Sequence, residues 1–248
     1  MLFDRWDYDK CLRKMLDSVK KNKVAIPVSY EEFKRIYFEV RRNMYNEVKH
    51  SHGEVDFCIR LTETVKRFNL NFDSGDPIII DAANAFFEGW DEDMRVDYSV
   101  FSVLETLKKN HMLGIVSNFP YRKALLTTLK RLDLNRFFRT IIISAELGVR
   151  KPHPRIFQKA LRALNVKAFE TVFVGDSLKA DIFGAQNVGM KTILLEDAEL
   201  KKNRYTVPGD LDYVTAKPDC TIADLRELTM AVTTLLKAET EFRVKKMI

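Results

Sequence analysis

From about residue 99 onward, the chain alternates amphipathic helical segments with short apolar runs, and this order limits its fold more than any other feature. Each of four helical segments leads into one such run: HMLGIVS (111–117), TIIIS (140–144), TVFVG (171–175) and KTILL (191–195). Nearly continuous apolar strands separated by helices are typical of a parallel sheet that is covered on both faces. We therefore predict an α/β fold with a doubly wound parallel sheet.

Residues 7 to 95 have a different pattern, because apolar residues recur there at every third or fourth position. This spacing predicts four amphipathic helices: one over 8–21, one opened by the capping sequence Ser29-Tyr30-Glu31-Glu32, one over 55–68 and one begun by Asp76-Pro77. Helices of this kind joined by short loops form a small bundle. We predict a helical subdomain over residues 1–96 and an α/β core over residues 97–248.

Composition excludes several classes of protein. No apolar run reaches the roughly 18 residues that span a bilayer, and residues 1–10 lack the apolar centre of a signal peptide. The cysteines, Cys11, Cys58 and Cys220, stand far apart, which favours buried thiols in a cytoplasmic protein over a disulfide framework. The net charge is +6, but the basic residues are spread along helices, so we expect neither a nucleic-acid nor a membrane partner.

Polar residues follow two of the apolar segments of the core, and ligands of open α/β sheets bind at the carboxyl ends of strands. Ser117 and Asn118 end the first run, where a hydroxyl and the following backbone N–H groups can hold an anionic oxygen; a helix cap is the alternative role. Lys151 precedes a helix that begins at Pro154, so its ammonium suits a phosphate or carboxylate, although an isolated loop lysine is usually solvated.

Two carboxylates follow the third apolar run. Asp176 comes directly after it, and Asp181 lies five residues further on. Such a pair suits a hard cation, above all Mg²⁺, which keeps several waters and takes substrate oxygens as further ligands. The alternative is structural: Asp176 caps the next helix, and Asp181 pairs with Lys151 or Lys179.

The order of IVSN, GVRKPHPRIF and VFVGDSLKADIFGAQNVGMKTILL resembles motifs II, III and IV of the haloacid dehalogenase (HAD) superfamily of hydrolases. The likeness covers about residues 99–196, and the helical region resembles the α-helical cap that this family inserts after motif I. The resemblance implies a Rossmann-like core with an inserted four-helix cap. It also implies roles: Ser117 and Asn118 would bind the transferred phosphoryl group, Lys151 would neutralise charge on the nucleophile and the phosphoryl oxygens, Asp176 would ligate Mg²⁺, and Asp181 would support the metal or Lys151.

The two-acid GDxxxxD form of motif IV resembles that of phosphatases within the family. The resemblance therefore implies a Mg²⁺-dependent phosphatase of small phosphorylated metabolites that works through an aspartyl-phosphate. Two alternatives stay open: a catalytically silent protein that binds phosphate or a partner in the same crevice, and a 2-haloacid dehalogenase. The sequence predicts neither the identity of the substrate nor the oligomeric state.

Motif I of the family, a hydrophobic strand followed by DxDGT, has no counterpart. Asp4 follows only Met1–Phe3 and has Trp6 two positions later; Asp81, Asp7 and Asp9 fall in predicted helices. Leu2-Phe3-Asp4 instead resembles the segment after motif I. We expect that about ten residues, the length of a strand and DxDG, either precede Met1 or have been lost. We also expect this chain to be weakly active or inactive, because the nucleophile of the covalent route is missing.

Overall fold

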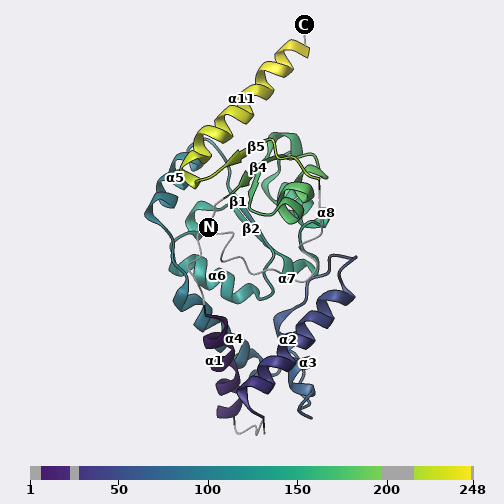
Figure 1. The fold of residues 1–248 in the computed structure, drawn as a ribbon. Helices are drawn as coiled ribbons and strands as arrows, with labels where there is room; N and C mark the ends of the chain where they lie inside the picture. Colours follow the sequence, from purple (N-terminus) through teal and green to yellow (C-terminus); the bar gives the residue numbers. More distant parts are fainter. Residues whose placement is uncertain (1–6, 23–27, 197–214, 247–248) are drawn as a thin grey trace.

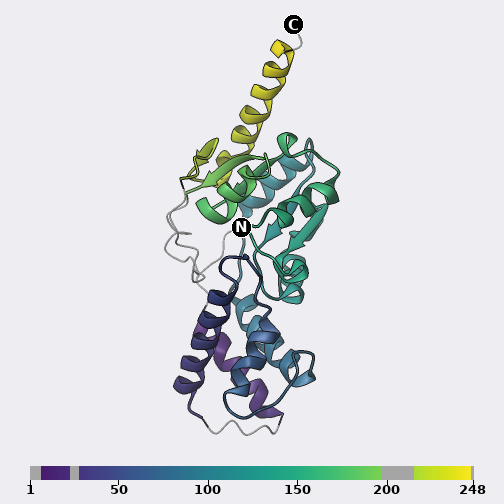
Figure 2. The same ribbon diagram turned by 90° about the vertical axis from the view of Figure 1, so that its right-hand side faces the viewer.

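The structure is a computed structural model that describes residues 7–22, 28–196 and 215–246. The interpretations of Asp4 and Trp6 therefore lie outside the described residues. Helices α1 to α4 gather at one end of the molecule, the strands lie at the other, and α11 extends outward from the strands; the two views agree on this arrangement (Figures 1 and 2).

The helical region contains the predicted helices: α1 (Tyr8–Lys21), α2 (Tyr30–Glu47), α3 (Phe57–Lys66) and α4 (Pro77–Asp93). Asp7 does not lie inside α1 as predicted but caps it, because its carboxylate accepts a hydrogen bond from the backbone N–H of Lys10 at 3.0 Å. Ser29 caps α2 in the same way through the N–H of Glu32. The buried face of α1, which includes Leu12 and Met15, packs along α4.

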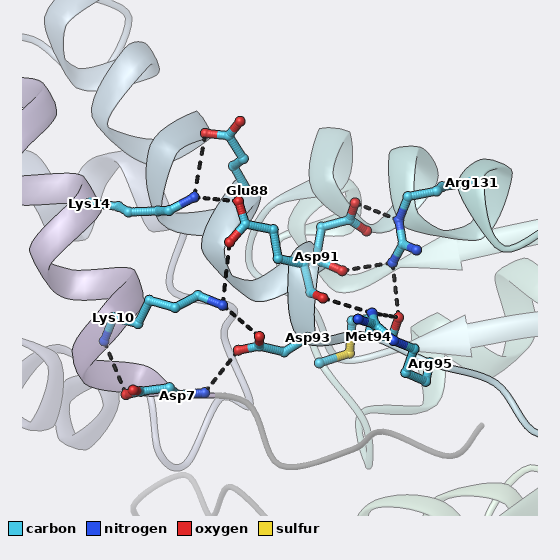
Figure 3. A network of polar contacts seen from close by, with 10 residues as sticks. Asp7, Lys10, Lys14, Glu88, Asp91, Asp93, Met94, Arg95 and Arg131 are labelled. Atoms are coloured by element: carbon cyan, nitrogen blue, oxygen red, sulfur yellow. Dashed lines mark hydrogen bonds and ion pairs between the residues drawn. The ribbon is translucent and has the colours of Figure 1, made fainter.

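Polar contacts connect α1, α4 and α6 (Arg122–Arg131) along one side of the helical region (Figure 3). Lys10 of α1 pairs with Asp93 of α4. Arg131 of α6 pairs with Asp91 of α4 at 2.7 Å and donates to the carbonyl oxygen of Met94 at 3.1 Å. These contacts fix α4 between α1 and the first helix that follows a strand.

The remaining elements alternate as the sequence predicts. In chain order they are α5 (Tyr98–Lys108), β1 (Gly114–Ser117), α6, η1 (Asn135–Phe137), β2 (Thr140–Ile143), α7 (Ser144–Leu147), α8 (Pro154–Leu164), η2 (Ala168–Glu170), β3 (Val172–Gly175), η3 (Leu178–Phe183), α9 (Gly184–Gln186), β4 (Lys191–Leu195), β5 (Cys220–Ile222), η4 (Leu225–Glu227) and α11 (Leu228–Lys246). All paired strands run parallel. The predicted α/β class with a helical subdomain is confirmed, whereas the boundary between residues 96 and 97 stays a prediction.

The strands form two sheets where the sequence predicts one. In the described part of the chain, β1 pairs with β2, and β3, β4 and β5 form a separate sheet in that order. A cavity of about 560 Å³ lies between β1 and β3 and is lined by Ile115 and Val116 on one side and by Val172 and Val174 on the other. Helices α5 and α11 add further apolar side chains to its lining.

This cavity explains an unusual exposure of the two inner strands. Parallel strands are normally buried on both faces and flanked by neighbours. Every residue of β3 is only partly buried, and Gly114 of β1 is exposed. Within the described ranges, β1 and β3 each have one unpaired edge, and both edges face the apolar cavity. One further apolar strand would cover these edges and the cavity lining.

The segment between β3 and β4, predicted as one of the four helical segments that lead into the apolar runs, differs from a regular α-helix. Residues Leu178–Phe183 form a π-helical turn, and a short α9 follows. The N–H groups of Asp181 and Ile182 both bond to the carbonyl oxygen of Ser177, at 2.9 and 3.0 Å, which widens the first turn. No helix among the described residues combines the length and the apolarity that crossing a lipid bilayer requires.

Candidate active site

Lys151 lies at the centre of the predicted site. Its Nζ forms an ion pair with Oδ1 of Asp181 at 2.7 Å and donates a hydrogen bond to the carbonyl oxygen of Val116, in β1, at 2.9 Å. The side chains of Lys151 and Asp181 are 13% and 5% exposed, so water screens this pair little. The ammonium is thereby fixed beside the carboxyl end of β1, next to Ser117.

The side chain of Asn118 holds the backbone of Lys151. Its Oδ1 accepts from the Lys151 N–H at 2.7 Å, and its Nδ2 donates to the Lys151 carbonyl oxygen at 3.1 Å. The amide therefore joins the end of β1 to the loop before α8, a positioning function that the sequence interpretation did not include. The predicted role of Asn118 in binding a phosphoryl group stays a prediction.

Asp181 connects Lys151 to the end of β3. Its Oδ2 accepts hydrogen bonds from the backbone N–H groups of Asp176 and Ser177, at 3.1 and 3.0 Å. Of the roles that the sequence leaves open for Asp181, the pair with Lys151 is the one that these contacts show. The structure thus brings Asn118, Lys151 and Asp181 together between the carboxyl ends of β1 and β3, where Ser117 and Asp176 also lie.

Gly175 makes this arrangement possible. A Cβ at this position would overlap the side chain of Asp181, so that the carboxylate could not reach the N–H groups after β3. We expect Gly175→Ala to lower the free energy of unfolding by about 1–3 kcal/mol through overpacking. Urea denaturation measures the change. Gly75→Ala is the control, because a Cβ there meets nothing within 4 Å; equal losses in the two variants would contradict the steric explanation.

The described residues include carboxylates that could hold one Mg²⁺ ion. They contain no group of three or more His, Cys, Asp or Glu side chains placed to hold a metal. Mg²⁺, however, needs only one or two protein carboxylates when waters and substrate phosphate complete its shell. Asp176 is exposed at the carboxyl end of β3, and Asp181 lies directly behind it. This donor set fits the ion, with Asp176 as the accessible carboxylate.

Ser144 and Glu54 are site neighbours that sequence reasoning missed. The buried Oγ of Ser144 accepts from the Phe119 N–H at 2.8 Å and donates to the carboxylate of Glu54. The pair therefore connects the loop after β1 to the segment between α2 and α3. Ser144 directly follows the run TIII, so the rule that found Ser117 could have found it, whereas nothing local marks Glu54.

The sequence model of haloacid dehalogenase-like hydrolases matches residues 19–195, which is most of the chain. The chain belongs to this family. Its fold agrees with that of a solved 2-haloacid dehalogenase from Pseudomonas syringae pv. Tomato DC3000, with a TM-score of 0.64 and 24% identity, over 93% of this chain and 94% of that one. At this identity the likeness supports the fold of the HAD-family chain and nothing further.

Curated relatives of this HAD-family chain are named as phosphatases. Glyceraldehyde 3-phosphate phosphatase of Pyrococcus furiosus is 48% identical over 92 residues, which cover 37% of this chain and 38% of that protein. Ribulose-1,5-bisphosphate 5-phosphatase of Halopiger xanaduensis is 31% identical over 164 residues, 64% of this chain and 67% of that protein. The match to the Pyrococcus protein spans well under half of its length.

Proposed function

We propose that the chain is a Mg²⁺-dependent phosphatase of small phosphorylated metabolites. The observation that carries this proposal is the buried Lys151–Asp181 ion pair, which holds an ammonium at the edge where Ser117 ends β1 and Asp176 follows β3. A fixed cation at this position attracts an anionic substrate and stabilises negative charge that develops during phosphoryl transfer. The names of the curated relatives support the same reaction class.

Each residue of the site has a proposed role. The Ser117 hydroxyl and the segment of Asn118 bind phosphoryl oxygens, and Lys151 neutralises charge on those oxygens and on the nucleophile. Asp181 orients Lys151 and stands behind the cation site, and Asp176 holds Mg²⁺. When bound, Mg²⁺ supplies positive charge next to the phosphoryl group.

The nucleophile is proposed to be an aspartate at the end of a strand between β1 and β3. The cavity there, with its apolar lining, supports this position. The candidates within the described ranges serve other purposes: Asp81 lies in α4, Asp7 caps α1, and Asp9 pairs with Lys34 at 2.8 Å. The covalent route depends on an aspartate at that position.

We expect the 248-residue chain to release phosphate slowly from a general phosphate monoester, and only with Mg²⁺ present. Asp176→Asn should abolish this activity, because an amide is a much poorer ligand for a hard cation than a carboxylate. Asp73→Asn, at an exposed position outside the site, is the matched control and should keep it. Release of phosphate by p-nitrophenyl phosphate hydrolysis is the measurement.

Two other outcomes point to the alternative functions. Binding of Mg²⁺ and inorganic phosphate without turnover would favour a silent binding protein. Chloride release from a 2-haloacid without metal would favour a dehalogenase. Turnover that Asp176→Asn leaves unchanged would overturn the proposed metal site.

A further inference from the structure

The segment between α2 and α3 is hydrogen-bonded to two loops of the candidate active site. The Phe57 N–H donates to the carbonyl oxygen of Pro120, in the loop after β1, at 3.1 Å. The Glu54 N–H donates to the carbonyl oxygen of Gly148, in the loop before α8, at 3.0 Å. This segment of the helical region therefore holds both loops from one side.

The carboxylate of Glu54 has hydrogen-bond donors on both of its oxygens. Its Oε1 accepts from the Tyr45 hydroxyl at 3.2 Å and from the Val55 N–H at 2.9 Å. Its Oε2 accepts from the hydroxyl of Ser144. Three donors thus fix the orientation of a single, partly buried carboxylate.

Ser144, which is fully buried, connects this carboxylate to the backbone of Phe119. Its Oγ accepts from the Phe119 N–H at 2.8 Å. Its one hydroxyl hydrogen has two acceptors in reach, the Glu54 carboxylate and, at 3.3 Å, the Phe119 carbonyl oxygen. The carboxylate is the stronger acceptor and lies closer, so the hydrogen points to Glu54 and an oxygen lone pair stays available for the Phe119 N–H.

The bond to Ser144 fixes one peptide unit of the turn that follows β1. A peptide unit is planar, so fixing the Phe119 N–H also fixes the carbonyl group of Asn118. The ring of Phe119 packs on α4, with its centre 5.4 Å from that of Phe87 and 5.0 Å from that of Trp90. The turn is therefore held at its backbone and at a side chain.

We propose that Glu54 and Ser144 are positioning residues that hold the turn after β1 in the geometry that binds the phosphoryl group. Neither residue touches the substrate; both act through the backbone of Phe119 on Ser117 and Asn118. Positioning of this kind matters because a hydrogen bond to an anion weakens steeply when its donor is displaced or misaligned. The inference rests on the proposed phosphatase function and adds to it a residue of the helical region.

Isothermal titration calorimetry with inorganic phosphate, in the presence of Mg²⁺, tests this proposal. Ser144→Ala removes the acceptor of the Phe119 N–H, and we expect it to weaken phosphate binding about 10-fold, the usual effect of losing one such hydrogen bond. Glu54→Gln keeps an oxygen acceptor but no charge, so we expect a loss of about 3-fold. Because both changes act through one hydrogen bond, the double variant should bind phosphate no more weakly than Ser144→Ala alone.

Thr128→Val is the matched control. The Thr128 hydroxyl is also buried and donates to a carboxylate, that of Asp91, but it joins α6 to α4 outside the candidate active site. The variant should lose stability in urea denaturation as Ser144→Ala does and keep the wild-type affinity for phosphate. Circular dichroism checks that each variant folds, and Glu54→Gln alone is compared with the control if Ser144→Ala does not fold.

The outcomes separate this inference from the proposed function. Wild-type phosphate affinity in folded Ser144→Ala and Glu54→Gln would overturn the inference and leave the phosphatase proposal standing. An equal loss of affinity in Thr128→Val, or losses that add in the double variant, would also overturn it, since general destabilisation would then explain the effect. If the wild-type chain bound no phosphate at all, the proposed function would fail and this inference with it.

Discussion

Replacing Asp181 by asparagine is expected to lower the free energy of unfolding by about 3–5 kcal/mol, because it leaves the buried ammonium of Lys151 without its carboxylate. The exposed fractions of the two side chains, 13% and 5%, leave little water to take over that role. The asparagine side chain is also uncharged, so its oxygen accepts the hydrogen bonds from the N–H groups of Asp176 and Ser177 more weakly than a carboxylate does. Urea denaturation followed by circular dichroism measures the change.

An exposed ion pair of equal length provides the control. Asp133 and Arg136 also approach to 2.7 Å, but their side chains are 65% and 47% exposed. We expect Asp133→Asn to cost at most about 1 kcal/mol, since water and salt screen an exposed pair. Equal losses at the two positions would contradict burial as the cause. The double variant Lys151→Met with Asp181→Leu should recover part of the loss, because it removes both buried charges.

Local rules account for the elements that the sequence predicted well. Helix α1 begins and ends where its apolar spacing indicates, and Ser29 caps α2, as predicted, through a bond to the backbone three residues away. Capping and helical periodicity involve residues that are close in sequence, so both can be predicted without knowledge of the fold. The same holds for the strands, whose apolar runs are bounded by polar residues or glycine.

Contacts between distant residues account for what the sequence did not predict. The π-helical turn at Leu178–Phe183 contains Asp181, whose carboxylate accepts hydrogen bonds from N–H groups after β3, although the apolar spacing there suits a regular helix. The division of the strands into two sheets depends on which strand lies beside which. Neither the π-helical turn nor the division into two sheets can be predicted from the spacing of residues that are close in sequence.

The site shows the same distinction. The rule that ligands bind at strand ends selected Ser117, Asn118, Lys151, Asp176 and Asp181 from the sequence, and the structure places Asn118, Lys151 and Asp181 in contact. It could not select Glu54, because this loop residue reaches the site only through tertiary packing, by its hydrogen bond with Ser144.

Supplying a strand to the cavity between β1 and β3 is expected to have the largest effect on activity. An N-terminal extension of about ten residues, five of them Val or Ile and followed by Asp-Val-Asp-Gly, is long enough for one strand and its turn. Burial of these Val and Ile side chains and pairing with the edges of β1 and β3 oppose the entropy cost of ordering the extension. We expect the free energy of unfolding to rise, as measured by urea denaturation.

The same extension should raise Mg²⁺-dependent phosphate release by at least about 100-fold, because it adds a nucleophile and an acid–base carboxylate beside Lys151 and Asp176. An otherwise identical extension with Asn in place of the first Asp separates the two effects: it should stabilise the fold equally and leave turnover at its low starting value. A third extension, with Ser replacing the Val and Ile residues, should do neither, since it buries no apolar surface. If the Asp extension stabilised the fold without faster turnover, the strand in the cavity would have a structural role only. Faster turnover with the Asn extension would exclude an aspartyl-phosphate. Completion of the sheet and provision of the nucleophile are thus distinguishable consequences of one strand.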